Sequence, residues 1–203
     1  MKKGLCIAAI IAVIMTAGCA MHHLQTPEVV PQGKIAGGLG VEGLDAGGVL
    51  VPFPGFWVRT GVAPNFDIGI KPWLLGLHVD GKYSFNDYFA VGTGGGFAFP
   101  LVLLYTAEAS LYGGVPIGEV LYPYAVLRAR YMGGSTTDIS DNISIAGSGV
   151  TGVLGLRLRL AEVFSVYGEG GVGLGLGGST SEGGSTGAGE PGFIFGFGIS
   201  VGH

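Results

Sequence analysis

Four arginines interrupt two of the most apolar stretches of the chain, VLRARYM and LGLRLRLA. Within each stretch the two arginines are separated by one residue, so both members of a pair lie on the same face of a β-strand. A guanidinium group can bind a carboxylate or another planar oxyanion through two parallel hydrogen bonds. The spacing therefore predicts a charged face formed by Arg128, Arg130, Arg157 and Arg159.

Two carboxylates belong to the segments that flank these arginines. Glu108 and Glu169 share the parity of the small and polar residues in their own segments. Because four arginines outnumber two acids, two interpretations are open. The group is either an ion-pair network that fills and rigidifies an interior, or a site that selects anions.

A second polar group begins at His78. Asp80 and Lys82 follow it at intervals of two, and Arg59 has the polar parity of another segment. A histidine beside a carboxylate is part of the serine hydrolase machinery, and Ser84 lies on the same segment. At strand rise, however, Ser84 is roughly 20 Å from His78. We therefore expect no catalytic residue, no metal site and no cofactor, with a barrel enzyme acting on lipids or peptides as an alternative.

The segments that carry these residues alternate with a period of two. In YFAVGTGGGFAF, residues 88–99, one parity is bulky and apolar, and the other is mostly glycine and alanine. Segments of about 8–12 residues match the roughly 9–11 residues that a tilted strand needs to cross a bilayer. Ten segments of this kind are predicted, at about 33–43, 56–63, 65–71, 75–85, 88–99, 104–114, 121–131, 148–160, 164–177 and 191–202.

The composition supports strands over helices. Glycine accounts for 42 of 203 residues, and glycine is unfavourable inside helices. The chain is 48% hydrophobic, yet no run after residue 20 has the length of a spanning helix. The net charge of -4 offers no basic surface for nucleic acid, which excludes nucleic acid as an expected partner.

The basic residues mark one face of the predicted strands. Beyond Lys2 and Lys3, all eight lysines and arginines fall on the small or polar parity of their segments. A basic residue facing lipid at the bilayer midplane costs about 2–4 kcal/mol. The pattern predicts an all-β fold, a transmembrane antiparallel up-and-down β-barrel of about ten strands, with its apolar face toward lipid and its charged face toward the lumen.

The N-terminus has the layout of a signal peptide, with two lysines, an apolar stretch and then Thr16-Ala17-Gly18-Cys19. The last four residues resemble a bacterial lipobox, in which the cysteine is lipidated. Ordinary cleavage near Ala20 is the alternative. We expect a signal peptide over 1–18, a lead segment over 19–32 and a barrel over 33–203. The N-terminus would be periplasmic and anchored by a lipid on Cys19.

The connections predict which end of the barrel faces outward. Five connections alternate with short turns and would be the outer loops, at 44–55, 72–74, 100–103, 132–147 and 178–190. The glycine- and serine-rich loops 132–147 and 178–190 read as solvated. The apolar stretches 49–57 and 99–105 fit either the outer aromatic girdle or a partner contact.

Taken together, the lipobox, the ten segments and the aromatic residues resemble a bacterial outer-membrane β-barrel protein with a lipoprotein-type signal. The resemblance implies a Gram-negative outer membrane, contact with its lipids and insertion by the barrel assembly machinery. The chain departs from that class by ending in Val201-Gly202-His203 without a terminal aromatic residue. We expect a porin-like structural or narrow-channel role, with an Arg/Glu network across the lumen and a small anionic solute as its ligand. A surface adhesin that uses the outer loops is a further alternative.

Overall fold

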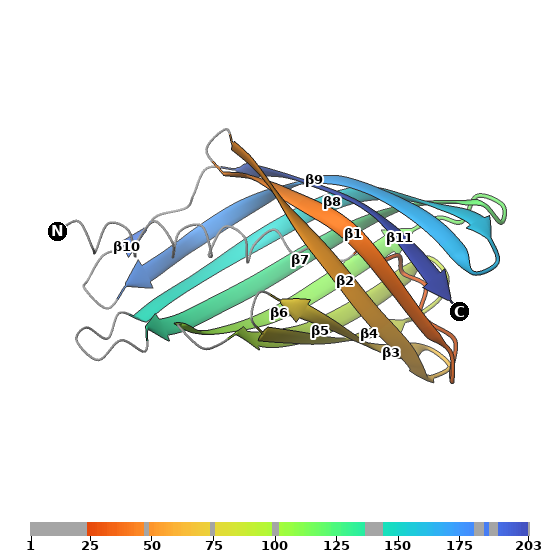
Figure 1. Cartoon of the computed structure of the whole chain (residues 1–203), viewed down its shortest axis with the longest axis horizontal. Helices are drawn as coiled ribbons and strands as arrows, with labels where there is room; N and C mark the ends of the chain where they lie inside the picture. Colours follow the sequence, from red (N-terminus) through yellow and green to blue (C-terminus); the bar gives the residue numbers. More distant parts are fainter. Residues whose placement is uncertain are drawn as a thin grey trace.

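In the computed structural model, which describes residues 24–46, 49–73, 76–98, 102–136, 144–180, 185–186 and 191–202, the chain forms a ring of tilted strands (Figure 1). No helix in these ranges has the length and hydropathy of a membrane span. The strands are β1 (Ile35–Ala46), β2 (Val49–Ala63), β3 (Phe66–Trp73), β4 (Gly76–Ser84), β5 (Phe89–Ala98), β6 (Val102–Gly114), β7 (Leu121–Thr136), β8 (Ser144–Ala161), β9 (Phe164–Thr180), β10 (Ser185–Thr186) and β11 (Gly192–Gly202).

Ten of these strands close into a barrel. Each pairs antiparallel with the strand before it, and β11 pairs with both β9 and β1. The closing seam runs from Ala36 opposite Gly202 to Leu44 opposite Ile194. The two-residue β10 is an addition to the end of β9. The predicted all-β antiparallel barrel of ten strands is confirmed. Closure gives each strand of this ring a neighbour on both sides, although β2 extends past its pairing with β3 between Val49 and Trp57.

Exposure alternates along the strands as the parity of the sequence predicts. On β6, Leu104, Thr106, Glu108, Ser110 and Tyr112 are buried, and the residues between them are exposed. The exposed set is apolar, as Leu103, Leu111 and Tyr105 illustrate. The barrel therefore presents an apolar outside and a polar inside.

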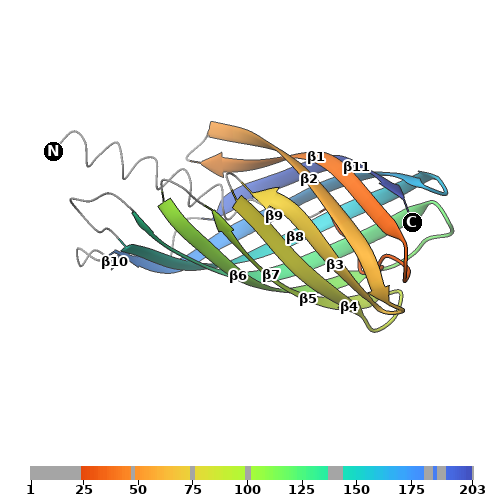
Figure 2. The same cartoon turned by 60° about the horizontal axis from the view of Figure 1, so that its bottom comes forward.

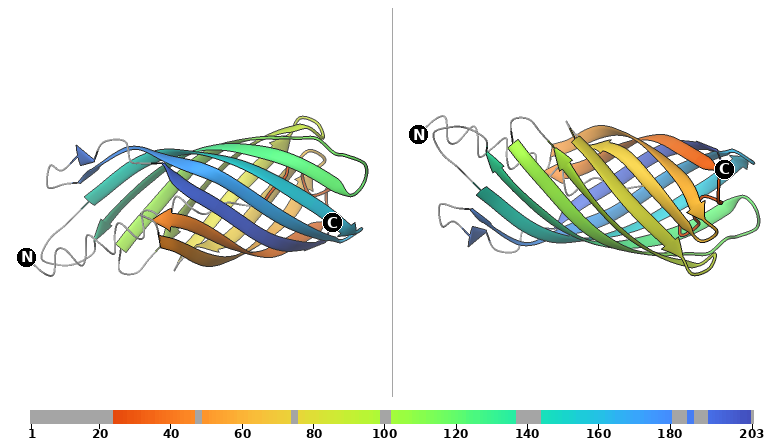
Figure 3. Two further views of the ribbon diagram at one scale, coloured as in Figure 1. Left: turned by 90° about the horizontal axis from the view of Figure 1, so that it is seen from above. Right: turned by 90° about the horizontal axis from the view of Figure 1, so that it is seen from below.

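Short turns gather at one end of the barrel, where β11 also ends (Figure 3). They join β2 to β3, β4 to β5, β6 to β7 and β8 to β9. In the β4–β5 turn, Asn86 Oδ1 accepts hydrogen bonds from the backbone N–H groups of Tyr88 and Phe89, both at 2.9 Å. Such a side-chain bond replaces the backbone pairing that the turn lacks. We call this end of the barrel the short-turn end.

At the opposite end the strands are longer than the sequence predicts. The connection expected over 44–55 is mostly strand, because β1 extends to Ala46 and β2 starts at Val49. The expected loop 132–147 is also too long, since β7 ends at Thr136 and β8 starts at Ser144. Antiparallel pairing continues through Gly and Ser residues that show no hydrophobic alternation, as between Ser135 and Ser144. Pairing needs only backbone groups, and so it extends beyond the amphipathic pattern.

The expected loop 178–190 is shortened in the same way. β9 continues to Thr180, and Ser185 and Thr186 of β10 fold back to pair with Ser179 and Gly178. The apolar stretch 49–57 lies on β2, where Phe56 is exposed on the outer surface. Figure 2 shows β6 to β9 extending beyond the shorter strands β3 to β5.

Candidate lumen site

The lumen holds residues 24–31 of the chain, which the sequence places in a lead segment ahead of the barrel. Leu24, Gln25 and Thr26 are each 3–4% exposed, and Pro27 is fully buried. The segment has no strand or helix pairing of its own until Gln32, which bridges to Gly61. We call residues 24–31 the inner segment. The expected signal peptide and lipidation residue Cys19 lie outside the described residues.

Leu24 sits in a notch lined by glycines of the closing seam. A Cβ placed on Gly198 would lie 2.1 Å from Leu24 Cδ1, and one on Gly40 would lie 2.8 Å from it. Gly40 is near the middle of β1, so the inner segment starts halfway along the barrel and leaves at the short-turn end. The absence of side chains at these two positions makes room for the inner segment.

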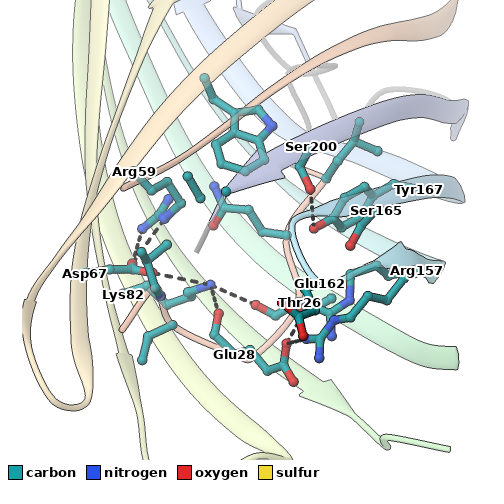
Figure 4. A pocket seen from close by; sticks show the side chains of 18 residues that line it. Thr26, Glu28, Arg59, Asp67, Lys82, Arg157, Glu162, Ser165, Tyr167 and Ser200 are labelled. Carbon is teal, nitrogen blue, oxygen red and sulfur yellow. Dashed lines mark hydrogen bonds and ion pairs between the residues drawn. The ribbon is translucent and has the colours of Figure 1, made fainter. Parts of the chain in front are cut away.

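The first ion cluster joins β2, β3 and β4 to the inner segment (Figure 4). Arg59 donates from Nη2 to Asp67 Oδ1 at 2.5 Å. It also donates from Nη1 to Asp80 Oδ2 at 2.5 Å. Asp67 Oδ2 accepts the backbone N–H of Val30 at 2.8 Å. Lys82 Nζ lies 3.9 Å from the same carboxylate oxygen of Asp67. Two cations and two anions therefore balance inside the wall, and a buried charge with such partners is tolerated.

The second cluster binds a carboxylate of the inner segment. Glu28 Oε2 lies 2.5 Å from Arg157 Nη1 and 3.4 Å from Arg159 Nη2. The guanidinium of Arg157 also lies over the ring of Tyr122, with 4.9 Å between Cζ and the ring centroid. Both arginines of the β8 pair thus face an acid that the sequence assigns to the lead segment.

The third cluster surrounds Glu108. Arg130 Nη2 lies 2.8 Å from Glu108 Oε2, and Arg128 Nε lies 3.9 Å from Oε1. His78 Nε2 lies 3.3 Å from the same Oε1. Arg128 also donates from Nε to Ser110 Oγ at 3.0 Å. The arginines of β7 and those of β8 therefore have different carboxylate partners.

Glu169 is hydrogen-bonded to a tyrosine of β7. Its Oε1 accepts the Tyr124 hydroxyl at 2.5 Å, and its side chain lies next to Gly196. The tyrosine in turn occupies the space that the missing side chain of Gly155 leaves, with ring atoms 2.3–2.7 Å from where a Cβ would be. The glycines of the inner faces thus accommodate a leucine and a tyrosine. A Cβ on Gly69 of β3 would lie 2.4 Å from Arg59 Nη1, so this glycine makes room for an arginine.

The structure brings the candidate residues together in a different grouping from the one the sequence suggests. The sequence joins four arginines to Glu108 and Glu169, whereas the structure divides the arginines between the second and third clusters and pairs Glu169 with Tyr124. It also adds Asp67 and Glu28, which the sequence analysis leaves out of the network. Asp67 has the polar parity of its segment, so the alternation in the sequence could have placed it on the lumen face. Glu28 lies outside every alternating segment and carries no such signal.

The geometry around His78 and Ser84 does not form a hydrolase site. His78 faces Glu108, while Ser84 donates from Oγ to the backbone oxygen of Asn86 at 2.6 Å in the β4–β5 turn. Among the described residues, no three His, Cys, Asp or Glu side chains are grouped to hold a metal ion.

Little space remains beside the inner segment. A cavity of about 50 Å³ lies between it and the wall, lined by Gln25, Trp57, Arg59 and Arg157 among others. That volume suits one or two water molecules. The ring of ten strands, with its apolar outer face and ion-paired interior, defines the chain as a closed β-barrel with an occupied lumen.

Comparisons with known proteins leave the family open. No protein-family model matches the sequence, and no curated protein matches it. Among solved structures, Neisserial surface protein A matches with a TM-score of 0.41 and 11% identity, over 83% of this chain and 95% of that chain. The N-terminal β-barrel domain of Pseudomonas aeruginosa OprF matches with a TM-score of 0.42 and 11% identity, over 85% and 98%. The KdgM porin in complex with disordered oligogalacturonate matches with a TM-score of 0.40 and 13% identity, over 82% and 98%. None of these similarities assigns an activity or a ligand to this chain.

Proposed function

We propose that this chain is a small outer-membrane β-barrel with a structural or narrow-channel role. The observation that carries the proposal is that charged side chains lie on the inside of the barrel wall and apolar side chains lie on its outside. Arg59, Asp67 and Lys82 are almost fully buried inside, whereas Leu154, Phe197 and Phe193 are 63–73% exposed outside. Water would not favour so large an apolar surface, and the hydrocarbon of a bilayer does.

Aromatic residues support a membrane-sized band on the outer face. Tyr83, Phe85 and Phe89 are exposed near the short-turn end, and Phe97 and Tyr105 are exposed on the far side of the band. Phe89 and Phe97 are eight residues apart on β5. That separation is about 26 Å along a strand and about 20 Å along the membrane normal at a usual barrel tilt, close to the band of about 25 Å expected for outer-membrane barrels.

The lumen charges favour anions as the solute of a narrow channel. The Glu108 cluster combines one carboxylate with two arginines, and the Glu28 cluster does the same. Rings of arginine select anions in membrane pores. A small anionic solute is therefore the ligand class that we propose.

The signal sequence supports the location and the anchor. A lipobox-like Thr16-Ala17-Gly18-Cys19 fits export, a lipid on Cys19 and a chain that enters the membrane from the periplasm. Insertion would use the barrel assembly machinery. Incorporation of labelled palmitate that the Cys19→Ala variant loses would test the anchor.

Heat-modifiability on a gel, combined with membrane fractionation, tests the barrel in the membrane. A closed barrel keeps its compact form in detergent without heating and migrates differently after boiling, because the ring unfolds as a unit. We expect this shift and co-purification with the outer membrane after carbonate washing. A protein that carbonate extracts and that shows no shift would contradict the proposal.

A further inference from the structure

We propose that the half of the lumen at the short-turn end is a binding site for an extended peptide, that the inner segment is its resident ligand, and that release of this segment opens the barrel to anions. The proposal rests on the proposed function, since it needs the barrel to span a membrane. The lumen then has a ligand from the chain itself, and the ion clusters bind this ligand as well as filling the lumen.

The wall contacts the peptide backbone directly. Lys82 Nζ donates to the carbonyl oxygens of Thr26 and Glu28, at 2.9 and 2.5 Å. Asp67 accepts the N–H of Val30 at 2.8 Å. These groups lie on β3 and β4, so one side of the lumen binds alternate backbone positions of an extended chain. Charged partners make such hydrogen bonds roughly twice as strong as neutral ones.

The opposite side of the lumen contacts the side chains. Arg157 and Arg159 on β8 hold the Glu28 carboxylate. At the start of the segment, Leu24 fills the notch at Gly40 and Gly198. An apolar anchor and an acid four residues later therefore define what the site recognises, and the backbone contacts lie between and beyond them.

The segment can leave without breaking the barrel. Its bonds come from side chains of the wall, not from strand pairing, and the ring of strand pairs closes without the segment. The Glu28 and Arg159 side chains are 27% and 30% exposed, so water already reaches this part of the contact. The first backbone pairings with β2, from Gly33 and Lys34, come after the segment and would hold it nearby as a tether.

Release would change the charge of the lumen. Glu28 is the carboxylate that both Arg157 and Arg159 contact, and its departure would leave two cations facing the opened space. Lys82 would lose its two carbonyl partners at the same time. An open lumen lined in this way attracts anions and repels cations.

Planar-bilayer recordings of full-length variants test the proposal. We expect the wild type to show rare, brief openings. Glu28→Lys places a cation against Arg157 and Arg159, and it should raise the open fraction about tenfold or more, because repulsion replaces the ion pair with Arg157, whose side chain is 8% exposed. The reversal potential in a salt gradient should show anion preference. Glu119→Lys, on an exposed turn at the same end, makes the same charge change and should behave like the wild type.

An uncharged pair of variants tests the other anchor. Gly198→Leu fills the notch of Leu24 and should also open the barrel, whereas Gly170→Leu adds the same side chain where nothing lies within 4 Å and should not. Because a Cβ on Gly198 also lies 2.8 Å from the backbone oxygen of Leu39, the heat shift must first show that this variant folds. If Glu28→Lys and Gly198→Leu insert, show the heat shift and remain closed, the peptide site is wrong and the barrel stands. A wild type as open as these variants would also overturn it. A wild type that neither inserts nor shifts would contradict the proposed function itself.

Discussion

At the scale of single residues, Asp67 connects the barrel wall to the inner segment. Its side chain is fully buried, and its two oxygens contact Arg59, Lys82 and the backbone of Val30. A carboxylate in this position compensates two buried cations from neighbouring strands. Its loss would leave Arg59 with Asp80 as its remaining carboxylate partner and Lys82 without the carboxylate 3.9 Å away, which costs more than the net strength of the pairs.

We expect Asp67→Ala to destabilise the folded barrel by about 3–5 kcal/mol, because Arg59 and Lys82 would stay buried without it. The free energy of unfolding from urea titration in lipid vesicles measures the effect. Asp87→Ala is the matched control, since Asp87 is exposed in the β4–β5 turn, and surface changes stay within about 0.5 kcal/mol. Equal losses for the two variants would show that the cluster contributes no stability.

The residue types and their parity were enough to predict which charges face inward, but not which charges meet. Parity places Arg128 and Arg157 on the face opposite the leucines, and both are buried in the lumen. Their partners depend on the shear of the barrel and on what enters the lumen. The pairing of Arg157 with Glu28 crosses 129 positions of the chain, and no local pattern carries that information.

At the scale of elements, β8 shows how one strand combines an apolar outer face with a charged inner face. Leu154, Leu156 and Leu160 are exposed on its outer face, while Arg157 between them is buried. The period of two fixed this division in advance. The ends of the strand were not predictable, because Ser144 to Gly147 pair through their backbones while their side chains show no amphipathic signal.

We predict a depth-dependent cost for arginine on the outer face of β8. Leu154→Arg lies near the middle of the strand and should cost about 2–4 kcal/mol of folding free energy in bilayers, whereas Leu160→Arg, at the short-turn end, should cost about 0–1 kcal/mol. The two sites share a strand, a face and a high exposure of 73% and 62%. Urea titrations in vesicles compare them. Equal costs would mean that this face does not cross the hydrocarbon.

At the scale of the whole molecule, the even number of strands sets the topology. The start of β1 and the end of β11 lie side by side at the short-turn end, with Ala36 opposite Gly202. If export delivers the chain to the periplasm, the short turns stay there and the connections at the other end reach the cell surface. The signal sequence and the turn lengths together predict this orientation.

An epitope inserted between Thr136 and Ser144, in the connection from β7 to β8, should bind antibody on intact cells. The same epitope after Gly118, in the β6–β7 turn, should bind antibody only after lysis. Because both insertions lie between strands of one barrel, each controls for expression of the other. Labelling of the Gly118 site on intact cells would reverse the proposed orientation.

The tether between the inner segment and β1 has a consequence for competition. Three residues, 32–34, separate the segment from the first residue of β1. So short a connection keeps a departed segment at an effective concentration in the millimolar range or above. A free peptide of the same sequence would have to reach that concentration to hold the lumen in its place. The barrel would therefore reclose quickly after each opening, and the tethered segment would keep each opening brief.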